Sequence, residues 1–272
     1  MIHPTAIIHP QARIHSSAAV GPYAVIDGDV ELSEGCIIGP HVYLTGMTTI
    51  GPGNHFFAGC VIGEAPQDLK YDGQKSRVRI GSQNVFREHV TVHRSTSSAD
   101  DTVIGSHNFL MQNSHVGHNV KVSDHVILAG GAMLAGHSLV QERAFISGNC
   151  LVHQFVRVGA LSMMQGGAAI SKDLPPFTMA RGYNAICGLN TVGLRRAGIN
   201  PPERLELKKL YRLLFRDGGN IRQALAEAQK IFTNGLALEL LRFVMASQRG
   251  VCADRAAKRH ESAIKDSSRE ES

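Results

Sequence analysis

Four histidines fall in one stretch of the chain, at spacings that a regularly repeating fold would bring together: His115, His118, His137 and His153. The spacing is clearest for His118, Gly136 and Gln154, which follow one another at intervals of eighteen residues. His137 and His153 adjoin the second and third of these positions. Because an imidazole exchanges protons near neutral pH, such a group favours general acid–base chemistry.

A metal site is the main chemical alternative for clustered histidines. Three imidazoles are enough for a catalytic zinc, and trimeric β-helix carbonic anhydrases use such a set. Their ligands include a histidine pair five residues apart, whereas His115 and His118 are three apart. We therefore expect no bound metal. A purely structural scaffold is a third alternative, but it gives no reason for this grouping among the fourteen histidines of the chain.

The elements that must position these histidines follow a six-residue repeat. From Ile2 to Ile170 nearly every sixth residue is apolar, and only Asp68, Gln74 and Ser98 interrupt the series. Four positions after each apolar residue the side chain is usually small. Neither an α-helix nor an alternating strand has this period. The pattern predicts a β-helix of hexapeptide repeats, in which three repeats close one triangular coil.

Stacking of the coils would bring distant residues together. If one coil takes eighteen residues, residues eighteen apart lie above one another at the ~4.8 Å spacing of parallel strands. His118, Gly136 and Gln154 then stack along one edge of the prism, with the neighbouring histidines within roughly 5–10 Å of each other. None of the four histidines occupies an inward apolar position, so core packing does not explain them.

The chain divides into three parts by pattern and composition. We expect the β-helix to span residues 1–189, with two polar segments projecting as loops at about 67–79 and 93–102. A composition rich in Leu, Ala, Lys, Arg and Glu predicts an α-helical domain over 190–250. The charged, Ser-rich tail over 251–272 is expected to be disordered.

Composition and charge exclude several classes of protein. The net charge is +5, and basic residues around Lys208, Lys209 and Arg212 favour an acidic partner or phosphate groups. Trp is absent, which argues against a stacking surface for nucleic acid. The five cysteines have no C-x-x-C spacing and are expected to be reduced. With no long apolar run and no N-terminal signal segment, we expect a cytoplasmic protein without an integral membrane segment.

Several short motifs, taken together, resemble one enzyme family. They are Gln67-Asp68-Leu69-Lys70-Tyr71, His115-Val116-Gly117-His118, Leu134-Ala135-Gly136-His137, Val152-His153-Gln154-Phe155, Asp173-Leu174-Pro175-Pro176, and Gly188-Leu189-Asn190 followed by Gly193-Leu194-Arg195-Arg196. Over about residues 1–250 the chain is similar to the UDP-N-acetylglucosamine O-acyltransferases, which catalyse the first step in making lipid A, the anchor of lipopolysaccharide. The related N-acyltransferase of the same pathway differs by an added N-terminal domain.

This resemblance implies a fold, a reaction and partners. The fold is a mainly β, left-handed parallel β-helix with a C-terminal α-helical domain, an exception to the usual right-handed crossover. It implies a homotrimer with active sites between subunits. The reaction would move a (3R)-3-hydroxyacyl chain from acyl carrier protein to the 3-hydroxyl of UDP-N-acetylglucosamine. No cofactor is then expected, since the donor is carried on the phosphopantetheine of acyl carrier protein.

The same resemblance implies roles for individual residues. His118 would be the general base for the sugar hydroxyl, and the backbone N–H of Gly136 would hold the oxyanion. The residues implied in substrate binding are Gln67, Asp68, Lys70, His115, His137, His153, Gln154, Asn190 and Arg196. Many relatives have aspartate directly after the base, where this chain has Asn119. An amide can orient an imidazole but cannot stabilise its cation by charge.

Two features of the substrates stay open at this point. One base can serve an oxygen or a nitrogen nucleophile, so N-acylation of a UDP-3-amino sugar is the alternative reaction. The sequence also leaves the length of the acyl chain unassigned.

Overall fold

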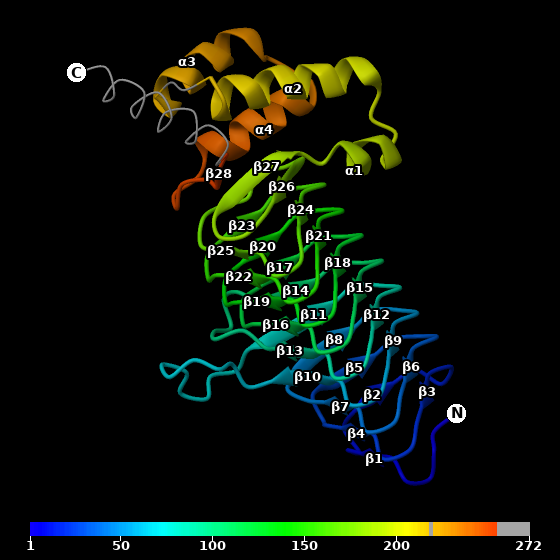
Figure 1. The fold of residues 1–272 in the computed structure, drawn as a ribbon. Helices are drawn as coiled ribbons and strands as arrows, with labels where there is room; N and C mark the ends of the chain where they lie inside the picture. The colour runs from blue at the N-terminus through cyan, green and yellow to red at the C-terminus, as the bar shows by residue number, and fades with distance from the viewer. Residues whose placement is uncertain (218–219, 255–272) are drawn as a thin grey trace, which may run out of the picture.

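The computed structural model describes residues 1–217 and 220–254 of the 272-residue chain and shows a prism of short strands capped by helices (Figure 1). The N-terminus lies at one end of the prism and the helices lie at the other. Successive strands pass from one face of the prism to the next, so three strands make one coil. The predicted fold class, a mainly β, left-handed parallel β-helix with C-terminal helices, is confirmed.

Each face of the prism is a sheet whose strands come from successive coils. The first sheet is ordered β1 (Ile7–Ile8), β4 (Val25–Ile26), β7 (Tyr43–Leu44), β10 (Val61–Glu64), β13 (Thr91–His93), β16 (His115–Val116), β19 (Met133–Leu134), β22 (Leu151–Val152) and β25 (Ala169–Ile170). The second is ordered β2 (Arg13–Ile14), β5 (Val30–Leu32), β8 (Met47–Ile50), β11 (Arg77–Ile80), β14 (Thr102–Ile104), β17 (Lys121–Val122), β20 (Leu139–Val140) and β23 (Arg157–Val158). The third is ordered β3 (Ala19–Val20), β6 (Ile37–Ile38), β9 (His55–Phe56), β12 (Val85–Phe86), β15 (Phe109–Leu110), β18 (Ile127–Leu128), β21 (Phe145–Ile146), β24 (Met163–Met164), β26 (Thr178–Ala180), β27 (Ala185–Leu189) and β28 (Ala253–Asp254).

The strand register shows the eighteen-residue period directly. Lys121 in β17 pairs with Leu139 in β20, eighteen residues on. The period lengthens where a segment leaves the prism, because Thr91 in β13 pairs with His115 in β16, twenty-four residues on. Side chains eighteen apart therefore stack only in the uninterrupted part of the repeat.

Two segments leave the prism between neighbouring strands. The first excursion spans residues 65–76 and is visible as the cyan loop beside β10 and β13 in Figure 1. The second excursion spans residues 94–101. The sequence predicted loops at 67–79 and 93–102. The first one ends earlier than predicted because β11 pairs with β8 from its first residue.

The inward positions of the repeat form a continuous apolar core. Ile26, Leu44 and Leu128 are at most 1% exposed. Phe56 and Phe86 stack inside the core with ring centroids 4.5 Å apart. Burying one such side chain contributes roughly 1.5–3 kcal/mol before the entropy of ordering it is subtracted. The core thus holds the coils in the register that the backbone bonds define.

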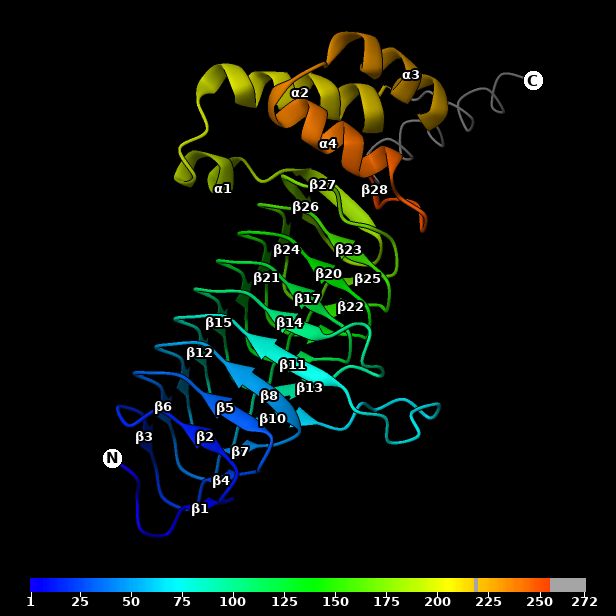
Figure 2. The ribbon, with the colours of Figure 1, turned by 180° about the vertical axis from the view of Figure 1, so that it is seen from behind.

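The helical unit closes the end of the prism opposite the N-terminus (Figure 2). It consists of α1 (Thr191–Arg196), α2 (Pro201–Phe215), α3 (Ile221–Ile231) and α4 (Gly235–Met245). Helix α2 begins with a capping box, in which the side chains of Asn200 and Glu203 each accept the other residue's backbone N–H. Strand β27 pairs antiparallel with β26 and so covers the edge of the third sheet.

A buried ion pair ties the last coil to α4. Arg157 Nη2 lies 2.7 Å from Asp173 Oδ2, which also accepts the hydroxyl of Ser247. Arg157 donates to the carbonyl of Phe243, and its guanidinium carbon lies 4.3 Å from the centre of that ring. Asp173 is 1% exposed, so without Arg157 its charge would be buried and unpaired. This contact fixes the helical unit on the prism.

The predicted disordered tail begins too early. Strand β28 extends the third sheet by pairing with β27. Asp254 is 4% exposed, and its Oδ2 accepts hydrogen bonds from Tyr211 Oη and Arg216 Nε. Residues 251–254 therefore belong to the folded unit, because Arg216, distant in the sequence, neutralises the carboxylate of Asp254. The rest of the predicted tail, residues 255–272, lies outside the described residues.

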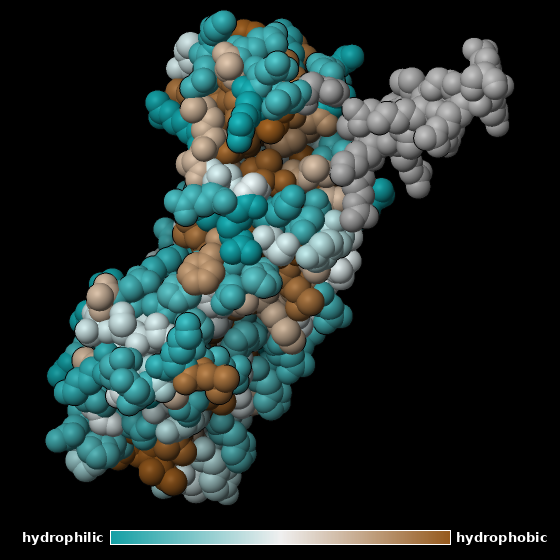
Figure 3. Space-filling view, turned by 90° about the vertical axis from the view of Figure 1, so that its left-hand side faces the viewer, coloured by the Kyte–Doolittle hydropathy of each residue, from teal (hydrophilic) through white to brown (hydrophobic). Residues whose placement is uncertain are grey.

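The outer surface differs from the core in polarity. Figure 3 shows a mostly hydrophilic face, with hydrophobic side chains gathered in separate patches. Among the helices described, none is long and apolar enough to cross a bilayer.

Truncating an inward side chain tests the orientation of the repeat. Leu128 is fully buried in the middle of the stack, so Leu128→Ala should leave a cavity and lower the free energy of unfolding by about 2–5 kcal/mol. The adjacent Ile127 is only partly buried, and Ile127→Ala should cost about 1 kcal/mol or less. Urea unfolding followed by circular dichroism measures both. Equal losses for the two variants would contradict the inward assignment of Leu128.

Candidate active site

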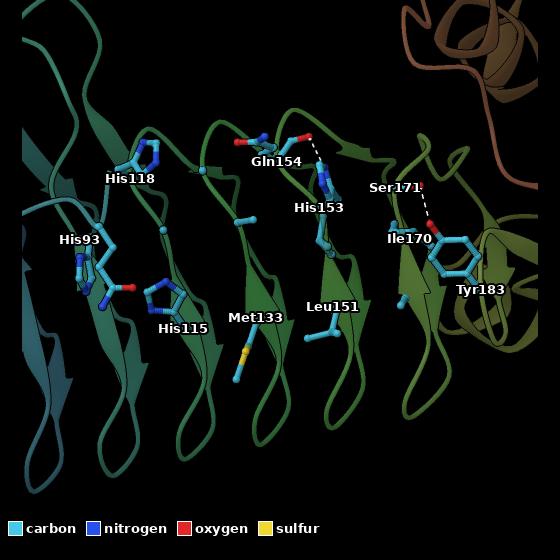
Figure 4. Close-up of a pocket in the computed structure, with 16 residues that line it drawn as sticks. His93, His115, His118, Met133, Leu151, His153, Gln154, Ile170, Ser171 and Tyr183 are labelled. Carbon is cyan, nitrogen blue, oxygen red and sulfur yellow. Dashed lines mark hydrogen bonds between the residues drawn. The ribbon is translucent and has the colours of Figure 1, made fainter. Parts of the chain in front are cut away.

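A pocket of about 550 Å³ runs along the first sheet, next to the first excursion. Its polar residues are Gln67, His93, His115, His118, His153, Gln154, Ser171 and Tyr183. Figure 4 shows the imidazoles of His93, His115 and His118 gathered at one end. Met133 and Leu151 lie along the middle of the pocket in the same view. The pocket therefore has a polar end rich in imidazoles and an apolar stretch beyond it.

His118 stands at a corner of the prism with its ring held in one tautomer. Nδ1 lies 2.9 Å from Oδ1 of Asn119, and because an amide oxygen only accepts, Nδ1 carries the ring proton. In the neutral ring Nε2 then has a free lone pair. A Cβ atom on Gly136 would lie 2.5 Å from Nε2, so Nε2 faces Gly136 across the step between two coils. This is the arrangement that a general base requires.

Gly136 is the position where this edge must lack a side chain. A Cβ there would lie 2.5 Å from both Nε2 and Cε1 of His118, so any larger residue would displace the ring. The backbone N–H of Gly136 has no protein acceptor among residues 1–217 and 220–254. A donor at the pocket wall without an internal partner is available to an oxygen atom of a ligand.

Two further imidazoles at the polar end are largely neutral at pH 7. His93 Nδ1 donates to the carbonyl of Ala65 at 2.6 Å, and His115 Nδ1 lies 2.8 Å from Thr91 Oγ1. Burial lowers the pKa of His115 to about 4, with a further contribution from His93 and His118. Burial also lowers the pKa of His93. Neutral rings can bind uncharged hydroxyl groups without adding cations around His118.

His137 lies against His118 outside the lining of the pocket. The two rings meet edge to face with centroids 5.2 Å apart, and His137 stacks on Phe155 at 4.6 Å. Burial lowers the pKa of His137 and the neighbouring His118 acts in the same direction, while Asp100 and Asp68 oppose this shift. His137 therefore packs against His118 from the next coil.

Other residues predicted to bind substrate gather around the same pocket. Gln67, His153 and Gln154 line it. Asp68 and Lys70 follow Gln67 on the first excursion, where Asp68 Oδ1 accepts the backbone N–H of Lys70 at 2.9 Å. The side chain of Lys70 is exposed.

Asn190 and Arg196 lie at the helical end and do not line this pocket. Asn190 caps α1: its Oδ1 accepts the N–H of Gly193 and its Nδ2 donates to the carbonyl of Leu161. The amide is thus already engaged within the chain. Arg196 is the last residue of α1 and is exposed. Within one chain, the structure does not bring these two residues to the histidines.

The sequence did not identify His93, Ser171 or Tyr183 as pocket residues. His93 follows the inward Val92, but the second excursion shifts the register between β13 and β16 to twenty-four residues. Counting in steps of eighteen therefore misses it. If the residues of the second excursion are left out of the count, the six-residue repeat places β13 beside β16 and brings His93 to the pocket.

No group suited to a metal ion is present in the part of the chain that the structure describes. Neither the pocket nor any other site there brings together three or more His, Cys, Asp or Glu side chains as metal ligands. The imidazoles instead direct Nδ1 to neighbouring protein oxygens. The geometry of these residues thus fits proton transfer better than zinc ligation.

Comparisons with known proteins agree on one family. A family profile described as "Udp N-acetylglucosamine O-acyltransferase; Domain 2" matches residues 173–252, and one described as "Bacterial transferase hexapeptide (six repeats)" matches residues 101–136. The chain is 47% identical over 247 residues to the acyl-(acyl-carrier-protein)–UDP-N-acetylglucosamine O-acyltransferase of Gloeothece citriformis, covering 90% of each chain. It is 42% identical over 254 residues to the protein of the same name from Thermodesulfovibrio yellowstonii, covering 92% of this chain and 98% of that one.

A solved structure gives the same result for the fold. The UDP-N-acetylglucosamine acyltransferase of Francisella novicida matches with a TM-score of 0.88 at 33% identity. The match covers 94% of this chain and 98% of the other. Likeness in sequence and in fold therefore extends over both the prism and the helical unit.

The low pKa of His115 predicts a specific dependence of stability on pH. The pKa is about 4 in the folded chain and about 6.5 in an unfolded one, so the unfolded chain takes up the proton first as the pH falls. Stability from the neutral ring is full above about pH 6.5 and is lost between there and about pH 4.

His115→Asn removes this titration while keeping a group that can bond to Thr91. Between about pH 7.5 and pH 5, its free energy of unfolding should fall less than that of the parent, by on the order of 1–2 kcal/mol. Urea unfolding at the two pH values measures the difference. The same pH dependence in both proteins would show that His115 is not buried as a neutral ring.

Proposed function

This chain belongs to the family of acyl-(acyl-carrier-protein)–UDP-N-acetylglucosamine O-acyltransferases, and we propose that the pocket beside His118 is where its reaction takes place. The protein is an acyltransferase of lipid A biosynthesis that transfers an acyl chain from acyl carrier protein to UDP-N-acetylglucosamine. The observation that carries the assignment of the site is the 2.9 Å contact between Nδ1 of His118 and Oδ1 of Asn119, together with the position of Nε2 facing Gly136.

His118 is the general base in this proposal. Nε2 accepts the proton of the sugar 3-hydroxyl while that oxygen attacks the thioester carbonyl of a (3R)-3-hydroxyacyl chain. Collapse of the tetrahedral intermediate expels the pantetheine thiolate, which the protonated His118 can reprotonate. No acyl-enzyme is needed, because binding both substrates beside one base supplies the proximity.

Gly136 supplies the donor for the developing oxyanion. Its backbone N–H is unpaired within the described part of the chain, and the residue lies directly against the His118 ring. A fixed donor contributes most when negative charge forms, so it stabilises the transition state more than the bound thioester.

The two ends of the pocket suit the two substrates. The neutral rings of His115 and His93 can bind sugar hydroxyls, with Gln67, Asp68 and Lys70 nearby on the first excursion. His137 contacts the base from outside the lining and completes the imidazole group. His153 and Gln154 lie further along and can bind the nucleotide. The apolar stretch of Met133 and Leu151 suits an acyl chain.

The partners follow from the same assignment. We propose a cytoplasmic homotrimer, in which the cleft between subunits brings the α1 segment that Asn190 caps, with the exposed Arg196 at its end, toward a ligand held beside the histidines of the next subunit. Exposed basic residues support docking of an acidic carrier protein: Arg195 and Lys208 line a second pocket of about 560 Å³ between β27 and α2. The acyl donor arrives on the phosphopantetheine of that carrier, and no other cofactor is invoked.

Replacing the base tests the site. His118→Ala should lower kcat by about 10²–10⁴-fold with little change in melting temperature. The assay follows the acylated product by mass spectrometry, with (3R)-3-hydroxyacyl carrier protein and either UDP-N-acetylglucosamine or its 3-amino analogue. His125→Ala, at another corner of the prism, is the matched control and should keep parental turnover. Near-parental turnover by His118→Ala with both sugars would exclude His118 as the base.

A side chain at Gly136 should also abolish turnover, for a steric reason. Gly136→Ala places a methyl group 2.5 Å from Nε2 of His118, so the ring must move away from the substrate hydroxyl. We expect kcat to fall at least about 10²-fold, comparable to losing a transition-state donor. In the control Gly148→Ala the new methyl meets nothing closer than 3.3 Å, and activity should change little. Equal activities of the two variants would contradict the placement of Gly136 against the base.

A further inference from the structure

The second excursion brings a carboxylate behind the proposed base. Residues 94–101 leave the prism after β13 and return at β14. Asp100 on this segment lies against the side chain of Asn119, the residue that follows His118. The connected series His118–Asn119–Asp100 thus ends on a negative charge, although the residue next to the base is a neutral amide.

All hydrogen-bonding groups of the Asn119 side chain are engaged. Its Oδ1 lies 2.9 Å from Nδ1 of His118 and also accepts the backbone N–H and the hydroxyl of Thr96, each at 3.1 Å. Its Nδ2 donates to both Oδ2 and the carbonyl oxygen of Asp100, each at 3.2 Å. Asn119 is 3% exposed, so these bonds are shielded from water and are stronger for it.

The carboxylate of Asp100 determines the orientation of the Asn119 amide. A carboxylate only accepts and the Thr96 N–H only donates, so the amide must turn Nδ2 to Asp100 and Oδ1 to Thr96. Oδ1 then meets Nδ1 of His118, which must hold the ring proton. In the reversed amide, Nδ2 would face Nδ1 and favour the tautomer with the proton on Nε2, which cannot accept a proton from a substrate.

Asp100 is itself held in a fixed position. Its Oδ1 lies 2.6 Å from Lys121 Nζ, which also donates to the carbonyl of Asp101. Asp101 is 4% exposed, and its carboxylate accepts Arg77 Nε at 3.1 Å and Arg79 Nε at 2.8 Å. The two arginines on β11 thus anchor the end of the excursion that carries Asp100.

Asp100 is ionised near neutral pH. Burial acts to raise the pKa of Asp100, but hydrogen bonds from Lys121 and Asn119 outweigh burial and lower the pKa overall. The charge of Lys121 and the nearby His137 act in the same direction. The group behind Asn119 is therefore an acceptor with full negative charge.

We propose that Asp100 is a positioning residue for the acyl transfer, which through Asn119 fixes the tautomer and ring orientation of His118. This inference rests on the proposed role of His118 as the base. When His118 takes up a proton, its Nδ1–H donates more strongly to Oδ1 of Asn119. An ionised Asp100 polarises the amide and so stabilises this state more than the ground state. The effect is expected in kcat rather than in KM.

Single substitutions separate this role from a simple loop contact. Asp100→Ala should lower kcat by about tenfold with KM for UDP-N-acetylglucosamine within about twofold of the parent. Lys121→Met removes the other partner of Asp100 but leaves its carboxylate on Nδ2 of Asn119, so kcat should stay within about twofold. If Lys121→Met instead matches the loss in Asp100→Ala, the ion pair and not the bond to Asn119 matters, and the proposal is overturned.

Exchanging the two side chains gives the sharper test. Asn119→Asp places a second carboxylate about 3.2 Å from that of Asp100, and the repulsion should displace residue 119 from Nδ1 of His118. We expect kcat to fall by tenfold or more, about the size of a lost charge-paired contact. Adding Asp100→Asn restores a donor–acceptor pair, with the charge now next to His118. The double variant should recover kcat to within about threefold of the parent.

The outcomes distinguish this inference from the function on which it rests. A parental kcat in Asp100→Ala, or a double variant no more active than Asn119→Asp, overturns the role of Asp100 while His118→Ala remains inactive. Turnover by His118→Ala overturns the proposed function itself. The double variant keeps the side-chain contact between residues 100 and 119 and loses only the bond from Nδ2 of Asn119 to the carbonyl oxygen of Asp100. It therefore decides the question even where Asp100→Ala lowers the melting temperature.

Discussion

Parallel hydrogen bonding between neighbouring coils is the constraint on which the rest of the molecule depends. Backbone N–H groups of one coil donate to carbonyls of both neighbouring coils, as from Gly117 to Leu134 of the next coil at 2.8 Å and from His137 to His118 of the preceding coil at 3.0 Å. Each coil is thereby fixed on its neighbour, and in the uninterrupted part of the repeat residues eighteen apart share one edge. Because the apolar positions stack inward in the same register, a slip of one residue would disrupt core and pocket together.

The proposed active site lies on one corner of this repeating frame. Asn119, His137 and Phe155 occupy successive corners with φ of 60°, 60° and 63°, a left-handed conformation that suits a sharp turn. The turn directs side chains out of the core, so His137 can stack on Phe155 and the Asn119 amide can meet the ring of His118. Gly136 lies against the His118 ring, where a side chain would collide with it. The stacked coils thus place His118, Gly136 and His137 beside one another.

What the sequence could predict follows the boundaries of the repeat. Where the repeat runs unbroken, spacing was enough to stack His118 over Gly136 and to predict a β-helix, whereas the left-handed sense came from the family resemblance. The excursions are not periodic, so the positions of His93 and Asp100 depend on contacts that spacing does not encode. The sequence also failed to predict that Asp254 is part of the folded unit. The composition of a charged terminal segment does not reveal that distant residues, here Tyr211 and Arg216, bind its carboxylate.

The most direct measurement of the central claim is a crystal structure of the protein with UDP-N-acetylglucosamine bound. If the stacked corner forms the catalytic site, the 3-oxygen of the sugar lies within hydrogen-bond distance of Nε2 of His118, at about 2.6–3.2 Å. The adjacent Gly136 N–H then points to the space beside that oxygen, where the thioester carbonyl must arrive. A sugar bound with its 3-oxygen facing another side chain, or more than about 5 Å from Nε2, would contradict the account.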